Sequence, residues 1–313
     1  MTLVMRNYQS EEDYWRIRAF LREVFLLNGR RELSWQAARL DYWRWHLIEN
    51  CKAVDSMEAV IFLWETEDGK IAAVLNPEDR GMIYLQTHPD FRTPELEEAM
   101  IAVAEEKLTV VSQKDGRKVL WVHAHNHDSL RQDLLQRRGY DKVDLPEVAA
   151  YERVRWLDAP IPDATIPAGY TVRALGDIDE LPARSWASWR GFHPDAPDSD
   201  YEGWEWYKSI QRAPLYRRDL DIVAVAPEGE ITAFCTFWYD DVTRTGYIEP
   251  VATVPEHLRK GLGKAIITEA LRRLKNMGGV AATVAGFSDA ANALYSAVVA
   301  PDYQLNEPWV KRL

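Results

Sequence analysis

The residues of this chain best suited to chemistry lie around a basic glycine turn, Arg259 to Lys264. Before the turn, Glu249 interrupts an apolar run typical of a buried strand, and burial raises the pKa of a carboxyl group toward the range of a useful base. After the turn, an amphipathic helical pattern continues to Leu274. Strand, glycine turn and helix together predict an anion site, because the first N–H groups of a helix lack intrahelical partners.

Two common phosphate-binding motifs do not match this turn. A P-loop has Ser or Thr after its lysine, where this chain has Ala265. A dinucleotide fingerprint has a third glycine where this chain has Ile266. The turn instead resembles the acyl-CoA loop of the GNAT N-acetyltransferase superfamily, Gln/Arg-x-x-Gly-x-Gly/Ala between a strand and a helix. Its first position departs from that pattern, because Leu258 stands there and Arg259 follows it.

The resemblance extends over residues 169–313, in which the predicted strands and helices follow the order of the superfamily. It implies acetyl-CoA as cosubstrate, with the pyrophosphate on the loop N–H groups and the pantetheine arm paired with strand backbone. The residues implied for CoA binding are Val251, Ala252, Thr253 and Val254 on the strand, Arg259, Lys260, Gly261, Leu262, Gly263 and Lys264 in the loop, and Asn292 on the last helix.

The resemblance also implies two catalytic residues. Acyl transfer to an amine needs a base for the amine and an acid for the departing thiolate. Glu249 corresponds to the base, acting through water, and Tyr295 to the acid. Three alternatives stay open: the glycines form an ordinary turn before a surface helix, Glu249 faces solvent at a strand end, and Tyr295 only packs in the core.

The chain also reads as two copies of one domain. A hairpin, a strand, a helix, a further strand and a further helix occur in the same order before and after a proline-rich segment. We expect a GNAT-like domain at 1–156, a linker at 157–168 and the catalytic GNAT-like domain at 169–313. The fold class predicted for each copy is α+β, a mixed sheet flanked by helices.

The first copy lacks the equipment of the second. The segment equivalent to the loop, His88 to Glu95, has no glycine, and Pro94 removes an N–H donor. Glu95 and Glu97 would repel a pyrophosphate. We therefore expect the first domain to keep the fold without binding CoA, and to contribute to the acceptor pocket or to the domain interface.

A metal site and several other kinds of partner are not expected. His123, His125 and His127 would share one face of a strand, a spacing that metal ligands use, but no Cys or carboxylate cluster accompanies them. The net charge of −11 argues against a nucleic-acid surface. No apolar run approaches the ~20 residues that span a bilayer. The N-terminus lacks a secretory pattern, and Cys51 and Cys235 form no CxxC pair, so we expect a cytoplasmic protein.

The function expected from the sequence is N-acetyltransfer from acetyl-CoA to a primary amine of a small molecule by direct attack, in the second domain of a monomer or homodimer. Two alternatives stay open: a non-catalytic regulator that binds CoA or another ligand, and an acyltransferase similar to mycothiol synthase, which shares the tandem plan. The sequence does not identify the acceptor. We expect the segment 191–206, with Trp204 and Trp206, to shape its pocket.

Overall fold

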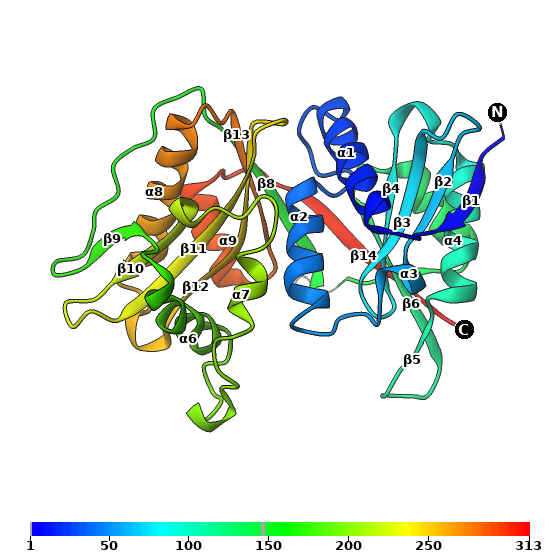
Figure 1. Cartoon of the computed structure of the whole chain (residues 1–313). Helices are drawn as coiled ribbons and strands as arrows, with labels where there is room; N and C mark the ends of the chain where they lie inside the picture. The colour runs from blue at the N-terminus through cyan, green and yellow to red at the C-terminus, as the bar shows by residue number, and fades with distance from the viewer. Residues whose placement is uncertain (1, 145–147) are drawn as a thin grey trace. The chain divides into compact units, whose positions relative to one another are not determined.

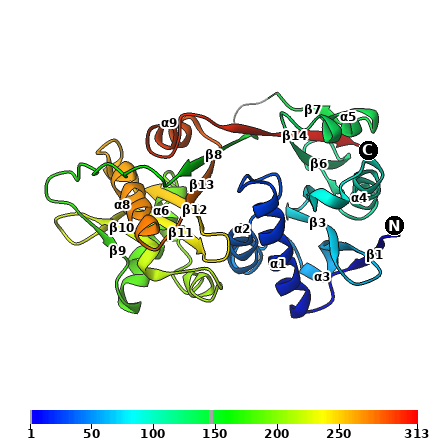
Figure 2. The ribbon, with the colours of Figure 1, turned by 90° about the horizontal axis from the view of Figure 1, so that it is seen from above.

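The computed structural model describes residues 2–144 and 148–313, which form two compact units. The first unit consists of Met1–Glu152 together with Gln304–Leu313, and the second consists of Arg153–Tyr303. Figure 1 labels most of the helices and strands of both units, and Figure 2 adds α5 and β7.

The first unit contains a mixed sheet flanked by helices. Its strands are β1 (Val4–Asn7), β2 (Phe62–Glu65), β3 (Ile71–Asp79), β4 (Met82–Thr87), β5 (Val110–Val111), β6 (Lys118–His125), β7 (Asp141–Lys142), the start of β8 (Ala150–Trp156) and β14 (Gln304–Arg312). Its helices are α1 (Glu11–Leu27), α2 (Ala37–Tyr42), the π-helix η1 (Trp43–Ile48), α3 (Met57–Val60), the 3₁₀ turn η2 (Pro89–Phe91), α4 (Pro94–Lys107) and α5 (Ser129–Arg137). The main order is β1-β2-β3-β4-β6-β14, with only β4 and β6 parallel.

Two hydrophobic clusters cover the two faces of this sheet. One joins Met100 of α4 and Leu134 of α5 to strand residues such as Leu85. The other joins Val24 of α1 and Leu40 of α2 to the opposite face. The pairs α4/α5 and α1/α2 therefore lie on opposite sides of the sheet, as Figure 2 shows.

The strand β14, at the end of the sequence, completes the first unit. It pairs antiparallel with β6 from Asn306↔His125 to Arg312↔Val119. Trp309, 7% exposed, joins the cluster beneath α4 and α5. The predicted domains differ here, because they ended the first copy at 156 and assigned 304–313 to the second. The sequence of β14 carries no local sign of its partner, since strand pairing is made between distant segments.

The predicted linker, 157–168, packs on the second unit. The Leu157 side chain is buried in the core of that unit, and its N–H donates to the Val280 carbonyl at 2.9 Å. Lys275 donates to the Ala159 carbonyl at 2.7 Å. The segment has no helix or strand, as expected. These contacts attach it to the second unit.

The second unit repeats the plan of the first. Its strands are the end of β8, β9 (Thr171–Ala174), β10 (Asp221–Val225), β11 (Ile231–Asp240), β12 (Thr245–Thr253) and β13 (Ala281–Gly286). Its helices are α6 (Leu181–Phe192), α7 (Tyr207–Ile210), α8 (Leu262–Asn276) and α9 (Asp289–Val298), with 3₁₀ turns η4 (Ile178–Glu180), η5 (Asp198–Asp200), η6 (Arg218–Leu220) and η7 (Pro255–His257). The order is β13-β12-β11-β10-β9, in which β12 and β13 are parallel and the other pairs antiparallel.

The sheet of the second unit is also covered on both faces. The apolar side of α8, including Ile266 and Leu271, packs against strand residues such as Phe237. On the opposite face, α6 contacts the sheet through Arg184, whose guanidinium lies 3.6 Å from the ring centre of Phe234. The series β10-β11-β12-α8-β13-α9 matches β2-β3-β4-α4-β6-α5. The predicted fold class and the internal repeat are thus confirmed.

Candidate functional site

The central feature of the second unit is the point where its two parallel strands part. β12 and β13 pair from Thr245↔Ala281 to Tyr247↔Thr283. β12 then continues to Thr253, still paired with β11 on its other side. Beyond Tyr247, one edge of β12 is therefore directed toward the opening rather than toward β13. An extended molecule can pair with such an edge as an added strand would.

A β-bulge places Glu249 at this opening. Phe237 of β11 pairs with Ile248 and Cys235 pairs with Val251, so Glu249 and its neighbour both lie opposite the single residue between them. The backbone carbonyl of Glu249 accepts a hydrogen bond from the indole N–H of Trp238. A bulge re-aims the side chains that it carries, and here it does so beside the opening.

The predicted turn has the backbone geometry that an anion site needs. Arg259 and Gly261 both have positive φ, +61° and +85°, and α8 begins at the next residue. Ala265 donates to the Gly261 carbonyl at 3.1 Å. The N–H groups from Leu262 to Lys264 precede this bond, so they lie outside the helical ladder at the positive end of the α8 dipole.

A cavity of about 480 Å³ lies between this turn, the end of β12 and α9. This volume is in the range of small-molecule and cofactor sites. Gly263 allows α9 to pack closely on the start of α8, because a Cβ there would lie 3.0 Å from Cδ2 of Leu294. The cavity is lined by Gly191, Phe192, Val251, Ala252, Thr253, His257, Leu258, Arg259, Gly261, Leu262, Gly263, Lys264, Ser288, Ala290, Ala291, Ala293, Leu294 and Tyr295.

Most of the predicted binding residues line this cavity, and three do not. Val254 is buried, 3% exposed. The Lys260 ammonium donates to the Tyr170 hydroxyl at 3.0 Å. The Asn292 side-chain oxygen accepts from Arg153 at 2.8 Å. Lys260 and Asn292 do not line the cavity and already bond other side chains, so their assigned contacts with CoA stay predictions.

Tyr295 lies at the cavity wall and is electrostatically coupled to Glu249. Burial raises the pKa of the Tyr295 hydroxyl well above its ordinary value, and the nearby carboxylate of Glu249 raises it further. The hydroxyl is therefore protonated throughout the neutral range. A protonated phenol can donate a proton, and a carboxylate can accept one, so the two proposed catalytic groups have complementary roles.

Sequence reasoning assigned Asn292 and Tyr295 of α9 to the site but missed the other residues of α9 and the end of α6 that line this cavity. Ala290, Ala291 and Ala293 leave room opposite the glycine turn, and Phe192 adds an aromatic surface. Alanines on a helix are common for reasons of helix propensity alone. The run of small residues on this helix is the sequence feature that could have indicated a cavity wall.

In the first unit, ion pairs join the segments equivalent to the glycine turn and α9. Arg92 bonds both Glu97 of α4, at 2.6 Å, and Asp128 at the start of α5, at 2.6 Å. Arg131 of α5 donates to the same Glu97 at 2.7 Å. Glu97 was predicted to repel a pyrophosphate, but its carboxylate is buried between two arginines. These bonds fill the region between the starts of α4 and α5 with ion pairs, whereas the corresponding residues of the second unit line the cavity.

The three histidines with metal-ligand spacing, His123, His125 and His127, have different surroundings. His125 at the end of β6 bonds Glu152 at 2.8 Å, and His127 lies 5.5 Å from the His125 ring. His123 stacks on Tyr84 instead. Within residues 2–144 and 148–313, no group of three or more His, Cys, Asp or Glu side chains is placed to hold a metal ion. No helix in these same ranges is long and apolar enough to cross a membrane.

Comparisons with known proteins agree with this architecture. Residues 178–298 match the model of the acetyltransferase (GNAT) family, so this segment is a GNAT domain whose family chemistry is acyl transfer from acyl-CoA. No curated protein matches the chain in sequence. The whole chain has the fold of a tandem GNAT protein: it is similar to one from the clavulanic acid biosynthesis pathway, with a TM-score of 0.67, 14% identity, and coverage of 99% of this chain and 98% of the other.

Two further solved structures share the fold. A GCN5-related N-acetyltransferase from Sphaerobacter thermophilus has a TM-score of 0.65 and 18% identity, over 99% of this chain and 95% of the other. The N-myristoyltransferase of Saccharomyces cerevisiae, solved with bound myristoyl-CoA, has a TM-score of 0.56 and 14% identity, over 98% of this chain and 78% of the other. At these identities the likeness concerns the fold alone.

Proposed function

We propose that the second unit is an N-acetyltransferase that moves an acetyl group from acetyl-CoA to a primary amine of a small molecule. The observation that carries this proposal is the cavity in which the glycine turn, the end of β12 and Tyr295 meet. The first unit, with arginine–carboxylate pairs in place of the turn, does not bind CoA.

The cavity offers separate contacts for the pyrophosphate and for the pantetheine arm of CoA. The N–H groups at the start of α8 bind the pyrophosphate, and the side chains of Arg259 and Lys264 add positive charge around it. The edge of β12 from Val251 to Thr253 pairs with the amide groups of the pantetheine arm. This arrangement directs the thioester toward the point where β12 and β13 part.

The reaction then needs only proton transfers from this chain. The neutral amine attacks the thioester carbonyl, a C–N bond forms, and the C–S bond breaks. Glu249 takes the amine proton, directly or through a water molecule, and the Tyr295 hydroxyl gives a proton to the departing thiolate. Solvent exchange returns both groups to their starting states.

Binding of acetyl-CoA is tested by isothermal titration of the full chain and of Gly261→Glu. The carboxylate added at the turn would repel the pyrophosphate, so we expect affinity to fall at least tenfold. Gly229→Glu is a matched control, because Gly229 also has positive φ, +92°, with open space around its Cβ. Gly229 lies in the hairpin between β10 and β11 and should leave affinity unchanged. Equal affinities for the wild type and Gly261→Glu would refute the loop assignment.

Catalysis is tested by CoA release in the presence of a panel of primary amines. Tyr295→Phe should lower kcat by about 10²-fold or more with little change in acetyl-CoA affinity, because the proton donor is lost and the packing is kept. Glu249→Gln should lower kcat, because the group that takes the amine proton is lost. If Tyr295→Phe weakened binding and left kcat intact, the residue would have a packing role.

A regulator that binds CoA without catalysis is the second candidate. Two observations favour it: Leu258, 54% exposed, replaces the Gln or Arg of the family pattern, and Asn292 is already bonded to Arg153. Acetyl-CoA binding without transfer to any amine of the panel would support this candidate over the enzyme.

A further inference from the structure

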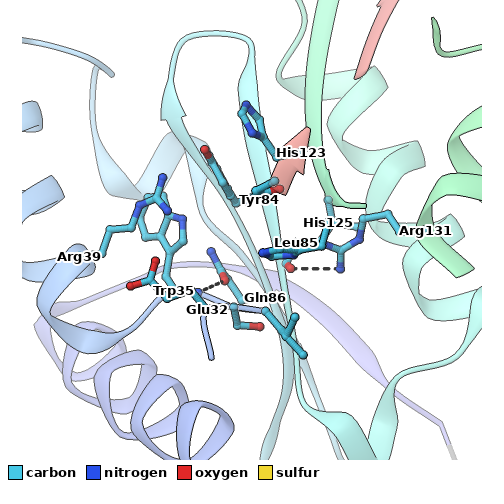
Figure 3. Close-up of a pocket in the computed structure, with 12 residues that line it drawn as sticks. Glu32, Trp35, Arg39, Tyr84, Leu85, Gln86, His123, His125 and Arg131 are labelled. Carbon is cyan, nitrogen blue, oxygen red and sulfur yellow. Dashed lines mark hydrogen bonds between the residues drawn. The ribbon is translucent and has the colours of Figure 1, made fainter. Parts of the chain in front are cut away.

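A small pocket lies inside the first unit where its own parallel strands part. β4 and β6 pair at Met82↔Trp121 and Ile83↔Val122. The residues that follow on each strand line the pocket, and the segment 32–39 closes it from the α1/α2 side (Figure 3). Its volume is about 10 Å³, which corresponds to about one water molecule. The pocket has the same topological position as the opening beside Glu249 in the second unit.

Four polar atoms of the residues around this pocket have no hydrogen-bond partner among the described residues. They are both ring nitrogens of His123, the indole Nε1 of Trp35 and the side-chain oxygen of Asn306. The three side chains are only 4%, 2% and 5% exposed. Buried polar atoms are nearly always bonded to protein or to an ordered guest, because they have lost their bonds to bulk water. So many unpartnered atoms around one pocket indicate a guest.

Apart from His123, the ionisable side chains at the pocket wall already have partners, among them Glu32, which accepts from Gln36. His125 bonds Glu152 at 2.8 Å, Arg39 bonds Glu78 at 2.7 Å, and Arg131 bonds Glu97. The hydrogen-bonding groups that remain available are therefore the neutral atoms described above. Such a set suits an uncharged ligand better than an ion.

The unpartnered atoms supply both donors and acceptors. Burial, with a further contribution from the charge of Arg39, lowers the pKa of His123 to about 3, so the ring is neutral and carries one donor and one acceptor nitrogen. The indole of Trp35 can only donate, and the carbonyl oxygen of Asn306 can only accept. A water molecule, which can donate two hydrogen bonds and accept two, complements this set of two donors and two acceptors, and the hydroxyl group of an alcohol complements all of it except one acceptor.

We propose that this pocket of the first unit is a binding site for a neutral hydroxyl group, supplied by water or by a small alcohol. The unit thus retains a polar centre at the place where the second unit has its proposed reaction centre. The proposal does not depend on the function of the second unit, because every residue involved belongs to the first.

The test is nuclear magnetic resonance of the full chain with ¹⁵N-labelled tryptophan. The Trp35 indole proton, assigned from its loss in Trp35→Phe, should show a nuclear Overhauser effect to a long-lived water proton. Trp309 is the matched control: its indole Nε1 is also buried without a partner, but it does not line the pocket. We expect no such effect at Trp309.

Added methanol distinguishes the two sources of the hydroxyl group. An effect between the Trp35 indole proton and the methyl group would identify an alcohol as a guest, whereas persistence of the water effect alone would identify water. His123→Phe keeps a ring against Tyr84 and removes two of the polar atoms, so it should weaken the effect at Trp35. A wild-type Trp35 indole with no contact to water or methanol would overturn the proposal, whatever the variants do.

Discussion

Replacement of Trp309 by alanine tests the assignment of β14 to the first unit. The side chain is 7% exposed and packs in the cluster that contains residues of α4, α5 and β6. Its indole nitrogen has no partner within the described ranges, so the loss is one of packing rather than of a hydrogen bond. Removing a buried aromatic side chain costs about 3–5 kcal/mol, and 3 kcal/mol corresponds to roughly a hundredfold change in an equilibrium constant.

The assay is native-state hydrogen exchange read by mass spectrometry. Peptides from α4, α5 and β6 should exchange roughly a hundredfold faster in Trp309→Ala, because they open together with the weakened unit. Peptides from α8 and β11 should be nearly unaffected. Leu313→Ala is the control within the same segment: Leu313 is 47% exposed, and its replacement should change exchange very little. Loss of protection in α8 and β11 rather than in α4 would refute the assignment and restore the division at 156.

Two further predictions concern stability. Asp221 is fully buried and accepts from Arg184 at 3.0 Å. Asp221→Ala should lower the free energy of unfolding in urea by about 3–5 kcal/mol, because it leaves a buried cation unpaired. The control Asp219→Ala removes an exposed pair with Arg217 and should lower it by about 1 kcal/mol or less. A cost for Asp221→Ala as small as that of the control would contradict this. His123 has a folded pKa of about 3, below the ordinary 6.5, so the unfolded chain binds more protons between these values and stability falls as pH falls through this window. Unfolding midpoints from pH 7 to pH 4 should therefore decline less steeply in His123→Phe, and equal slopes would show that His123 does not titrate in this way.

The sequence predicts those parts of the fold and site that depend on local patterns. Gly261 stands where φ is positive, and the helical period after it marks α8, so the turn could be located without a structure. Glu249 could be placed on a strand, but the bulge that re-aims it depends on the register with β11, which only the paired strands define. The burial of Glu97 between Arg92 and Arg131 could not be predicted either, because those arginines lie on separate elements.

The same limitation applies to the cavity and to the polar pocket. The alanines of α9 can be recognised as part of the cavity wall only from the structure, in which Leu294 of α9 lies close to Gly263. The polar pocket unites Trp35, His123 and Asn306, which come from three distant parts of the chain. Side chains that meet through tertiary packing leave no periodic or spacing signal in the sequence.

The place of β14 has a consequence for how the protein is made. Translation releases the N-terminal part of a chain first, and domains usually fold in that order. Here the strand that pairs with β6 emerges after the whole of the second unit. The edge of β6 that pairs with β14 therefore stays unpaired while the second unit is synthesised. An unpaired strand edge can pair with other chains. The second unit is expected to reach its native state first, and the unit encoded first is expected to finish last.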